Sequence, residues 1–403
     1  MPRCLFRPYF QLFVEKCKLN KRIKSSKILG IVLTARNNGD TKIELAGFPH
    51  HSLDTYLPKL VRAGERVAIC DQLEDPKATK GIVKRGVTEL VTPGVSYNEL
   101  TLETKKNNFL ASVYYGKKNI GVSFLDISTG EFLVAEGKVD YVDKLLQSLQ
   151  PAEILHPKNY QAAFKESFGN GFYTYGLDSW IFDEAFATEQ LLKQFQTSTL
   201  KGFGIAEQKL GIMAAGAILH YLKETEHPHL QHIHTIKSIV REEILWMDKF
   251  TIRNLELLHP LFSEGKSLVD VIDYTQTAMG SRLLKQWIIL PLKNAVAINR
   301  RLDIVDFFIK KIKILKACTQ CLSEMGDLQR LISKVALNRI GPRETLHLGT
   351  TLHLARNVKQ ILGEFKDLPF STLISGLNPC TELIDLIDSH ISEDAPLLAT
   401  KGN

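Results

Sequence analysis

Apolar and polar positions in the first hundred residues predict a small mixed α/β domain. Two short apolar runs, at 28–33 and 42–45, have strand character, and Asn37-Asn38-Gly39-Asp40 between them is typical of a turn. We therefore expect a β-hairpin. Apolar residues at helical spacing predict a helix over 52–63. Further buried-type strands are expected at 66–70 and 87–91, and residues 1–27 show no clear periodicity.

The pattern then predicts a second α/β domain followed by an all-helical region. A polar linker is expected at 99–108. Strands are predicted at 109–115, 120–127, 131–136 and 153–155, and helices at about 140–149 and 208–224. The last helix is rich in glycine and alanine, which permits close packing. Beyond about residue 240 the strand signal disappears, and prolines separate segments with apolar residues three and four positions apart.

Charge is unevenly distributed along the 403 residues. Residues 1–100 hold 17 Lys and Arg against 10 Asp and Glu, and the remainder holds 34 of each. The whole net charge of +7 therefore lies in the first quarter. A basic segment of this kind suggests a polyanionic partner, although a basic solvated surface would give the same count. No apolar stretch is long enough for a membrane span, and the six scattered cysteines indicate reduced, intracellular thiols.

Common catalytic and metal-binding motifs are absent from the sequence. It contains no phosphate loop, no GxGxxG, no GxSxG and no HExxH. Cys318 and Cys321 form a lone CxxC without the second pair that zinc needs. Four clustered histidines could approach a metal, but a solvated linker is the favoured interpretation; they are His227, His229, His232 and His234.

Asp126 stands at a predicted strand end, where ribonuclease-H-type nucleases place a metal-binding carboxylate. No partner carboxylates are matched to it, so a structural Asp that caps the following turn is favoured. In the first domain, a helix start after Phe48-Pro49-His50-His51 could bind phosphate through free amides. Nearby basic residues could contact a nucleic-acid backbone; they are Arg62, Arg66, Lys80, Lys84 and Arg85.

Several long motifs, in order, resemble the MutS family of bacterial DNA mismatch repair proteins. Three lie in the first domain: Ala46-Gly-Phe-Pro-His-His-Ser-Leu-Asp-Thr-Tyr-Leu-Pro, Val67-Ala-Ile-Cys-Asp-Gln-Leu-Glu-Asp-Pro76 and Leu90-Val-Thr-Pro-Gly-Val95. The resemblance continues through Gly121 to Phe132, Leu245 to Leu258, Met279-Gly-Ser-Arg-Leu-Leu-Lys-Gln-Trp287 and Gly326-Asp-Leu-Gln-Arg330. It covers about residues 24–403.

This resemblance implies a multidomain fold, α/β followed by all-α. It consists of a mixed α/β mismatch-binding domain at 1–98, a ribonuclease-H-like connector without nuclease activity at 107–226, and an incomplete helical lever at 240–403. The family's clamp and ATPase domains have no counterpart in this sequence. We therefore expect no enzyme activity and no cofactor in this chain, whereas the full-length family uses ATP and Mg.

The family reads a mismatch with a Gly-Asp-Phe-x-Glu motif, whose Phe wedges into the base stack while the Glu hydrogen-bonds the displaced base. Here Phe13-x-Glu15 retains the two key residue types, but the Gly-Asp is missing and a lysine-rich run replaces an acidic family segment. An alternative is that residues 1–23 are unrelated sequence. The resulting candidate DNA-binding residues are Phe13, Glu15, Phe48, Pro49, His50, Lys84 and Arg85.

The implied function is DNA mismatch repair through binding of double-stranded DNA with mismatches or small loops. Other mismatch repair proteins are the implied protein partners. The family forms a homodimer, but through the ATPase region. We expect a cytoplasmic, nucleoid-associated protein without membrane contact. The alternative function is a fragment that acts only as a protein-interaction module, or has no activity.

Overall fold

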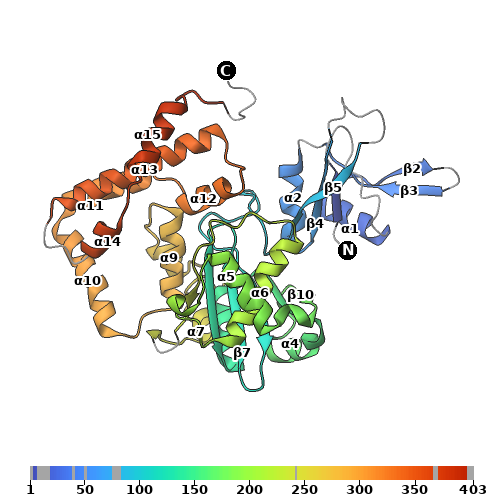
Figure 1. Ribbon diagram of the computed structural model, residues 1–403, viewed down its shortest axis with the longest axis horizontal. Coiled ribbons are helices and arrows are strands. Elements are labelled where there is room, and N and C mark those ends of the chain that lie inside the picture. The colour runs from blue at the N-terminus through green and yellow to red at the C-terminus, as the bar shows by residue number, and fades with distance from the viewer. Residues whose placement is uncertain are drawn as a thin grey trace. The chain divides into compact units, whose positions relative to one another are not determined.

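The computed structural model describes residues 3–6, 19–38, 41–49, 52–74, 83–240, 243–365 and 371–396. It divides into two compact units, which are distinguished in Figure 1 by their place along the colour bar. The first unit contains residues 1–104, 108–146 and 150–238. The second contains 105–107, 147–149 and 239–403. The predicted mismatch-binding and connector domains therefore lie in the same compact unit.

A three-stranded sheet with the order β1-β4-β5 forms the frame of the N-terminal domain. β1 (Arg3–Phe6) runs parallel to β4 (Val67–Gln72), and β5 (Arg85–Val91) runs antiparallel to β4. β2 (Thr34–Asn38) and β3 (Thr41–Leu45) form a separate antiparallel hairpin. Both predicted sheet strands are thus confirmed, and so is the second strand of the predicted hairpin at 42–45.

The strand predicted at 28–33 is wrong. The helix α1 (Leu19–Leu29) occupies its first part, and the hairpin begins only at Thr34. The reason lies in the tertiary packing of this segment. Leu29 is buried in the domain core, and Ile28 and Ile31 pack against the same apolar cluster. A short apolar run fits a buried helix end as well as a strand, so periodicity alone did not separate them. The described part of the lysine-rich segment, from Leu19 onward, is also helical, although residues 1–27 showed no clear periodicity.

Helix α2 (Leu53–Arg62) confirms the helix predicted at 52–63 and closes the core of this domain. Its apolar face buries Leu53, Leu57 and Leu60 against residues of β4 and β5. Burial of one such leucine side chain stabilises the fold by about 2 kcal/mol. This packing holds the loop that precedes α2 against the sheet.

The connector is built on a six-stranded sheet with the order β10-β9-β6-β7-β8-β11. Its strands are β6 (Leu110–Tyr115), β7 (Ile120–Asp126), β8 (Glu131–Gly137), β9 (Glu153–Pro157), β10 (Thr174–Leu177) and β11 (Lys237–Ser238). The first three are antiparallel, and β9 and β10 add in parallel beyond β6. These bounds confirm the four strands predicted in this region.

Helices cover the connector sheet. They are α3 (Val139–Leu149), α4 (Gln161–Phe168), α5 (Glu184–Phe195) and α6 (Lys209–Glu224), with short 3-10 turns η2 (Lys158–Tyr160), η3 (Ser179–Phe182) and η4 (Lys201–Phe203) between them. Figure 1 shows α5 and α6 together on one face of the sheet. A Cβ on Gly216 would lie 2.4 Å from the Ala187 Cβ, and one on Gly121 would lie 2.1 Å from the Leu210 carbonyl carbon. Gly216 on α6, together with Gly121 on β7, therefore permits the close packing predicted for this helix.

The second unit is helical throughout its described part. Its helices are α7 (Lys249–Asn254), α8 (Leu268–Ile272), α9 (Ala278–Ile289), α10 (Ala295–Lys310), α11 (Ile312–Ser323), α12 (Leu328–Ala336), α13 (Pro342–Gly363), α14 (Ser371–Gly376) and α15 (Thr381–His390). One apolar cluster joins α12, α13 and α15, and another joins α10, α11 and α13. None of the described helices combines the length and apolar character that a bilayer crossing requires.

Candidate nucleic-acid interface

The loop before α2 presents one exposed residue and one buried residue of the candidate DNA-binding set. Phe48 is 5% exposed and stacks on Tyr56 with ring centroids 4.4 Å apart. It belongs to the domain core, so its role in the loop is packing. Pro49 is exposed, and its carbonyl accepts a hydrogen bond of 2.9 Å from the Ser52 amide at the start of α2. His50, Phe13 and Glu15 lie outside the described residues.

Lys84 and Arg85 lie together at the open end of the β4–β5 pair. Both are exposed, and Arg85 is paired in register with Gln72. The Lys84 carbonyl accepts a hydrogen bond of 2.9 Å from the Leu73 amide, and its amide donates to the Glu74 carboxylate at 3.3 Å. The backbone is therefore fixed while the two cationic side chains reach solvent. This is the arrangement expected of residues that contact phosphates.

Two other basic candidates are engaged within the protein. The Arg62 guanidinium donates a hydrogen bond of 2.7 Å to the Leu100 carbonyl. The Arg66 guanidinium lies over the ring of Tyr175, with 3.7 Å between the guanidinium carbon and the ring centroid. Arg66 therefore faces the connector and is not placed to contact a nucleic-acid backbone.

Asp126 caps the turn after β7, as predicted. Its carboxylate is fully buried and accepts hydrogen bonds from the Ser128 amide at 2.9 Å and the Ser128 hydroxyl at 2.7 Å. It also accepts one from the Asn108 amide at 3.1 Å. These hydrogen bonds explain why a carboxylate is buried here, and they give Asp126 a structural role. Within the described ranges, no three His, Cys, Asp or Glu side chains converge in a way that could hold a metal ion.

The prediction of a solvated histidine linker is wrong for two of the four histidines. His227 is 2% exposed and His232 is 9% exposed, whereas His229 and His234 reach solvent. The His232 Nε2 lies 2.8 Å from the Ile127 carbonyl oxygen, which accepts a hydrogen bond from it. Burial lowers the pKa of His232. The segment crosses the β7–β8 turn instead of running through solvent, which the histidine spacing alone did not reveal.

Glu153 is the residue that sequence reasoning missed. It lies at the start of β9 with no exposed surface, where it accepts hydrogen bonds from both the N-terminal domain and the connector. The available signal was a carboxylate next to the apolar pair Ile154-Leu155 in a predicted strand. A charged residue is rarely fully buried without partners, so such a position calls for donors from elsewhere in the fold.

Comparison with known proteins gives an ordered set of matches. The model of MutS domain I matches residues 9–99, that of MutS domain II matches 108–234, and that of MutS domain III matches 250–403. The N-terminal match begins before Phe13 and Glu15 and includes both. The matched segments follow one another along nearly the whole chain.

Curated relatives agree with these matches. The chain is 54% identical over 380 residues to the DNA mismatch repair protein MutS of Christiangramia forsetii, covering 94% of this chain and 44% of that protein. It is 52% identical over 401 residues to the protein of the same name from Cytophaga hutchinsonii, covering 99% of this chain and 46% of that protein. The chain thus spans less than half the length of these relatives. With domains I, II and III matched in order at this level of identity, the chain belongs to the MutS family.

Proposed function

We propose that this chain binds double-stranded DNA at mismatches or small loops, as part of DNA mismatch repair. The observation that carries the proposal is the domain I match over residues 9–99, within a family whose curated members are named DNA mismatch repair proteins. The net charge of +7 within residues 1–100 is consistent with a polyanionic partner.

In this proposal Phe13 enters the base stack and Glu15 hydrogen-bonds the displaced base. Unstacking costs least where base pairing is already weak, so an apolar wedge favours a mismatch over a matched pair. Pro49 and His50 contact the duplex in this proposal, and the buried Phe48 supports the loop that carries Pro49. Lys84 and Arg85 contact phosphates, which position the protein without reading sequence.

Fluorescence anisotropy with labelled duplexes tests the proposal. Affinity for duplex DNA should fall steeply as salt increases, because phosphate contacts release condensed counterions. A duplex with one mismatch should bind more tightly than the matched duplex, and the preference should vanish in Phe13→Ala. Equal affinity of the unmodified chain for both duplexes would refute mismatch recognition.

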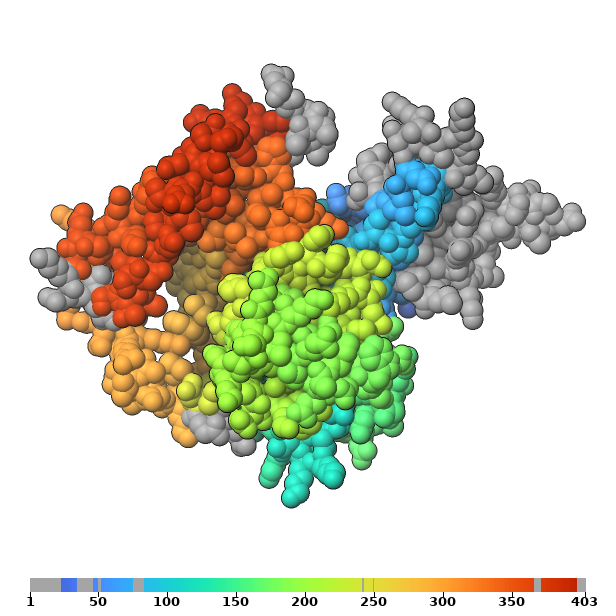
Figure 2. All heavy atoms as spheres, in the orientation of Figure 1, coloured from blue at the N-terminus to red at the C-terminus, as the bar shows by residue number. Residues whose placement is uncertain are grey.

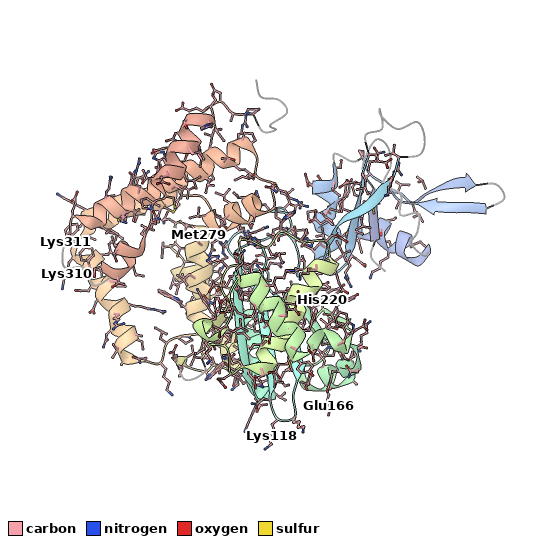
Figure 3. The ribbon with its side chains drawn as sticks, in the orientation of Figure 1. Lys118, Glu166, His220, Met279, Lys310 and Lys311 are labelled. Atoms are coloured by element: carbon pink, nitrogen blue, oxygen red, sulfur yellow. The ribbon has the colours of Figure 1, made fainter. Side chains whose placement is uncertain are left out.

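Matched lysine variants separate the phosphate contacts from general charge. Lys84→Ala should reduce the slope of log Kd against log salt by about one phosphate equivalent. Lys118→Ala is the control, because Lys118 is also an exposed lysine and lies on the β6–β7 turn of the connector (Figure 3). A comparable loss in both variants would show that Lys84 contributes only to net charge.

The proposed activity is binding without catalysis, and it should require neither ATP nor Mg. The same titrations with and without Mg-ATP test this expectation, because a change in mismatch preference would indicate a nucleotide site in this chain. We also infer that the connector has a ribonuclease-H-like fold, from the antiparallel β6–β8 strands followed by parallel β9 and β10. A DNA partner would place the protein at the nucleoid.

A second candidate function, a module for binding other mismatch repair proteins, is favoured by one feature of the connector. A cavity of about 550 Å³ lies beside α5 and α6, and its lining is mixed, with polar and basic side chains such as Gln190, Lys193 and Lys223 and apolar side chains such as Phe195 and Leu230. The segments that line it appear in green to yellow-green on the face shown in Figure 2. Capture of a repair protein that Lys193→Glu abolishes, with no DNA binding at low salt, would favour this function.

A further inference from the structure

The N-terminal domain and the connector meet at a buried polar contact that the mismatch-binding proposal does not use. The N-terminal domain contributes Arg66, Thr92 and Gly94, and the connector contributes Glu153, Tyr175 and Tyr221; we name these six residues the joint. All of them belong to the first compact unit. The joint lies where β5 ends and β9 begins, 61 residues apart in sequence from Thr92 to Glu153.

The Glu153 carboxylate is the centre of the joint. One oxygen, Oε2, accepts hydrogen bonds from the Thr92 hydroxyl and from the Gly94 amide, the latter at 3.2 Å. The other oxygen, Oε1, accepts a hydrogen bond of 2.7 Å from the Tyr221 hydroxyl. Glu153 has no exposed surface, so water does not replace a lost donor. One carboxylate therefore ties a turn of the N-terminal domain to a helix of the connector.

The turn fits closely against the connector strands. A Cβ on Gly94 would lie 2.8 Å from the Glu153 Cβ and 2.9 Å from the Leu110 Cδ1, so only glycine permits this approach. Asn108 donates a side-chain hydrogen bond of 2.9 Å to the Pro93 carbonyl. The turn between Thr92 and Val95 is closed by two backbone hydrogen bonds of 3.1 Å. Its position relative to β6 and β9 is thus set by contact as well as by hydrogen bonding.

Arg66 supplies a positive charge at the same place. Its guanidinium lies 3.7 Å from the Tyr175 ring centroid and 5.5 Å from the Tyr221 ring centroid. Burial raises the pKa of Glu153, and the hydrogen bonds from Thr92 and Tyr221 and the charge of Arg66 oppose that effect. A cation over tyrosine faces is favourable and adds a second link between the two domains.

Further contacts continue the joint along β5. The Leu90 amide donates a hydrogen bond of 3.1 Å to the Thr225 carbonyl just after α6. The His227 ring lies 3.6 Å from the buried Glu89 carboxylate. Because β1 pairs with β4 and β4 with β5, fixing β5 also holds β4 and β1 in place.

We propose that Glu153 is a positioning residue: it locks the β1-β4-β5 sheet onto the connector, so that the N-terminal domain and the connector move as one rigid body. This inference rests on the proposed function in one respect only: it takes the N-terminal domain, to which the β1-β4-β5 sheet belongs, as the part that binds mismatched DNA. The linker predicted at 99–108 would instead let the N-terminal domain move independently.

Hydrogen exchange by mass spectrometry on the 403-residue chain, without DNA, tests the proposal. Glu153→Ala leaves three donors without their acceptor, so amides of 67–72 and 85–95 should exchange about tenfold faster or more. Those of β7 and β8 should keep their protection. Glu136→Ala is the control, because Glu136 accepts a hydrogen bond of 3.0 Å from the Leu210 amide entirely within the connector. It should leave the amides of 67–72 and 85–95 unchanged.

Two outcomes would overturn the proposal. Unchanged exchange over 67–72 and 85–95 in Glu153→Ala would show that the carboxylate does not hold the sheet. An equal increase across β6 to β8 would show that Glu153 only stabilises the connector. If Glu153→Ala fails to fold, Thr92→Val provides the same test, because it removes one donor at nearly constant volume. Glu153→Gln keeps an acceptor oxygen and should restore most of the protection.

The DNA measurement is separate from this test. If the unmodified chain prefers mismatched DNA, Glu153→Ala should reduce that preference about fivefold to tenfold while Glu136→Ala retains it. An undiminished preference in a variant whose sheet exchanges freely would show that positioning does not serve recognition. If the unmodified chain shows no preference, the proposed function fails, and the exchange result alone decides the role of Glu153.

Discussion

The Arg66 guanidinium stacks on the Tyr175 ring at 3.7 Å, so a basic residue of the N-terminal domain is directed toward the connector. Its electrostatic surroundings include Tyr221 and Glu153, and its pKa is raised despite the opposing effect of burial. The basic excess of the first hundred residues is therefore not one uniform surface. Part of it stabilises the protein, and part of it remains available to a polyanion.

Replacing Arg66 should therefore affect stability and leave phosphate contacts intact. Arg66→Leu removes the cation–aromatic contact and should lower the free energy of unfolding by about 1 kcal/mol. The slope of log Kd against log salt should stay as in the unmodified chain, whereas Lys84→Ala should reduce it. Urea unfolding and DNA titration measure the two effects, and a reduced slope in Arg66→Leu would return Arg66 to the DNA-contacting residues.

Stability of the first unit should fall as the solution becomes mildly acidic. Burial lowers the pKa of His156 and of His232. Below the ordinary histidine pKa of about 6.5, the unfolded chain takes up protons that the folded chain does not. The free energy of unfolding should therefore be highest above that pH and should decrease as the pH falls below it.

Urea unfolding at pH 7.5 and pH 5.5 measures this dependence. In His232→Gln the decrease should be smaller, because one titrating group is gone while an amide can still donate to the Ile127 carbonyl. His229→Gln changes an exposed histidine and is the matched control. The assignment fails if both variants show the same change between the two pH values.

Close packing of α6 on α5 should make Gly216 intolerant of a methyl group. A Cβ there would lie 2.5 Å from the Ala187 Cα, which is backbone and cannot rotate away. Gly216→Ala should lower the free energy of unfolding by about 1–3 kcal/mol through overpacking. Gly202→Ala is the control, since nothing lies within 4 Å of its Cβ position. Thermal unfolding of both variants should show a clear loss only at Gly216.

In the second unit, the buried pair of Arg282 and Asp327 should matter more than exposed pairs. Arg282 donates two hydrogen bonds to Asp327, at 2.7 and 2.8 Å, and its side chain is only 4% exposed. Asp327 also caps α12 by accepting from the Arg330 amide at 3.4 Å. Arg282→Met should cost about 1–3 kcal/mol, because the Asp327 carboxylate, which is only 19% exposed, loses two hydrogen bonds from a charged donor.

The matched control is Lys310→Met on α10, where Lys310 pairs with Asp306 at 2.6 Å in solvent (Figure 3). Exposed pairs one helical turn apart contribute little to stability. Urea unfolding should therefore show a large loss in Arg282→Met and almost none in Lys310→Met. Similar losses would indicate that the buried pair is not a main source of stability in this unit.

Local sequence patterns predicted those helices and strands in which the spacing of apolar residues matches the face that is buried. The helix at 52–63, the strands of the connector and the helix rich in small residues could all be found because apolar spacing records which face is buried. The same reasoning failed at 28–33, where the run is too short to distinguish a helix end from a strand. Asp126 was understood correctly because its partner in the turn, Ser128, is only two residues away in sequence.

The candidate site was only partly predictable. Charge and motif resemblance selected Lys84 and Arg85, which the structure does present at the surface. They also selected Arg66 and Phe48, which it turns inward. A lysine or arginine has the same appearance in sequence whether it meets solvent, a phosphate or a tyrosine ring, so composition could not separate these cases.

By itself, the sequence determined the helix at 52–63, the main strands of the connector, the family resemblance and the location of the basic excess, since each depends on residue type and local spacing. The tertiary structure decided which polar residues are buried together. Glu153 finds Thr92 across 61 positions and Tyr221 across 68, and His232 finds the Ile127 carbonyl across 105. Such contacts form only when folding brings together residues that are far apart in sequence. A buried polar group needs a hydrogen-bond partner, and the neighbours in sequence of these residues do not provide one.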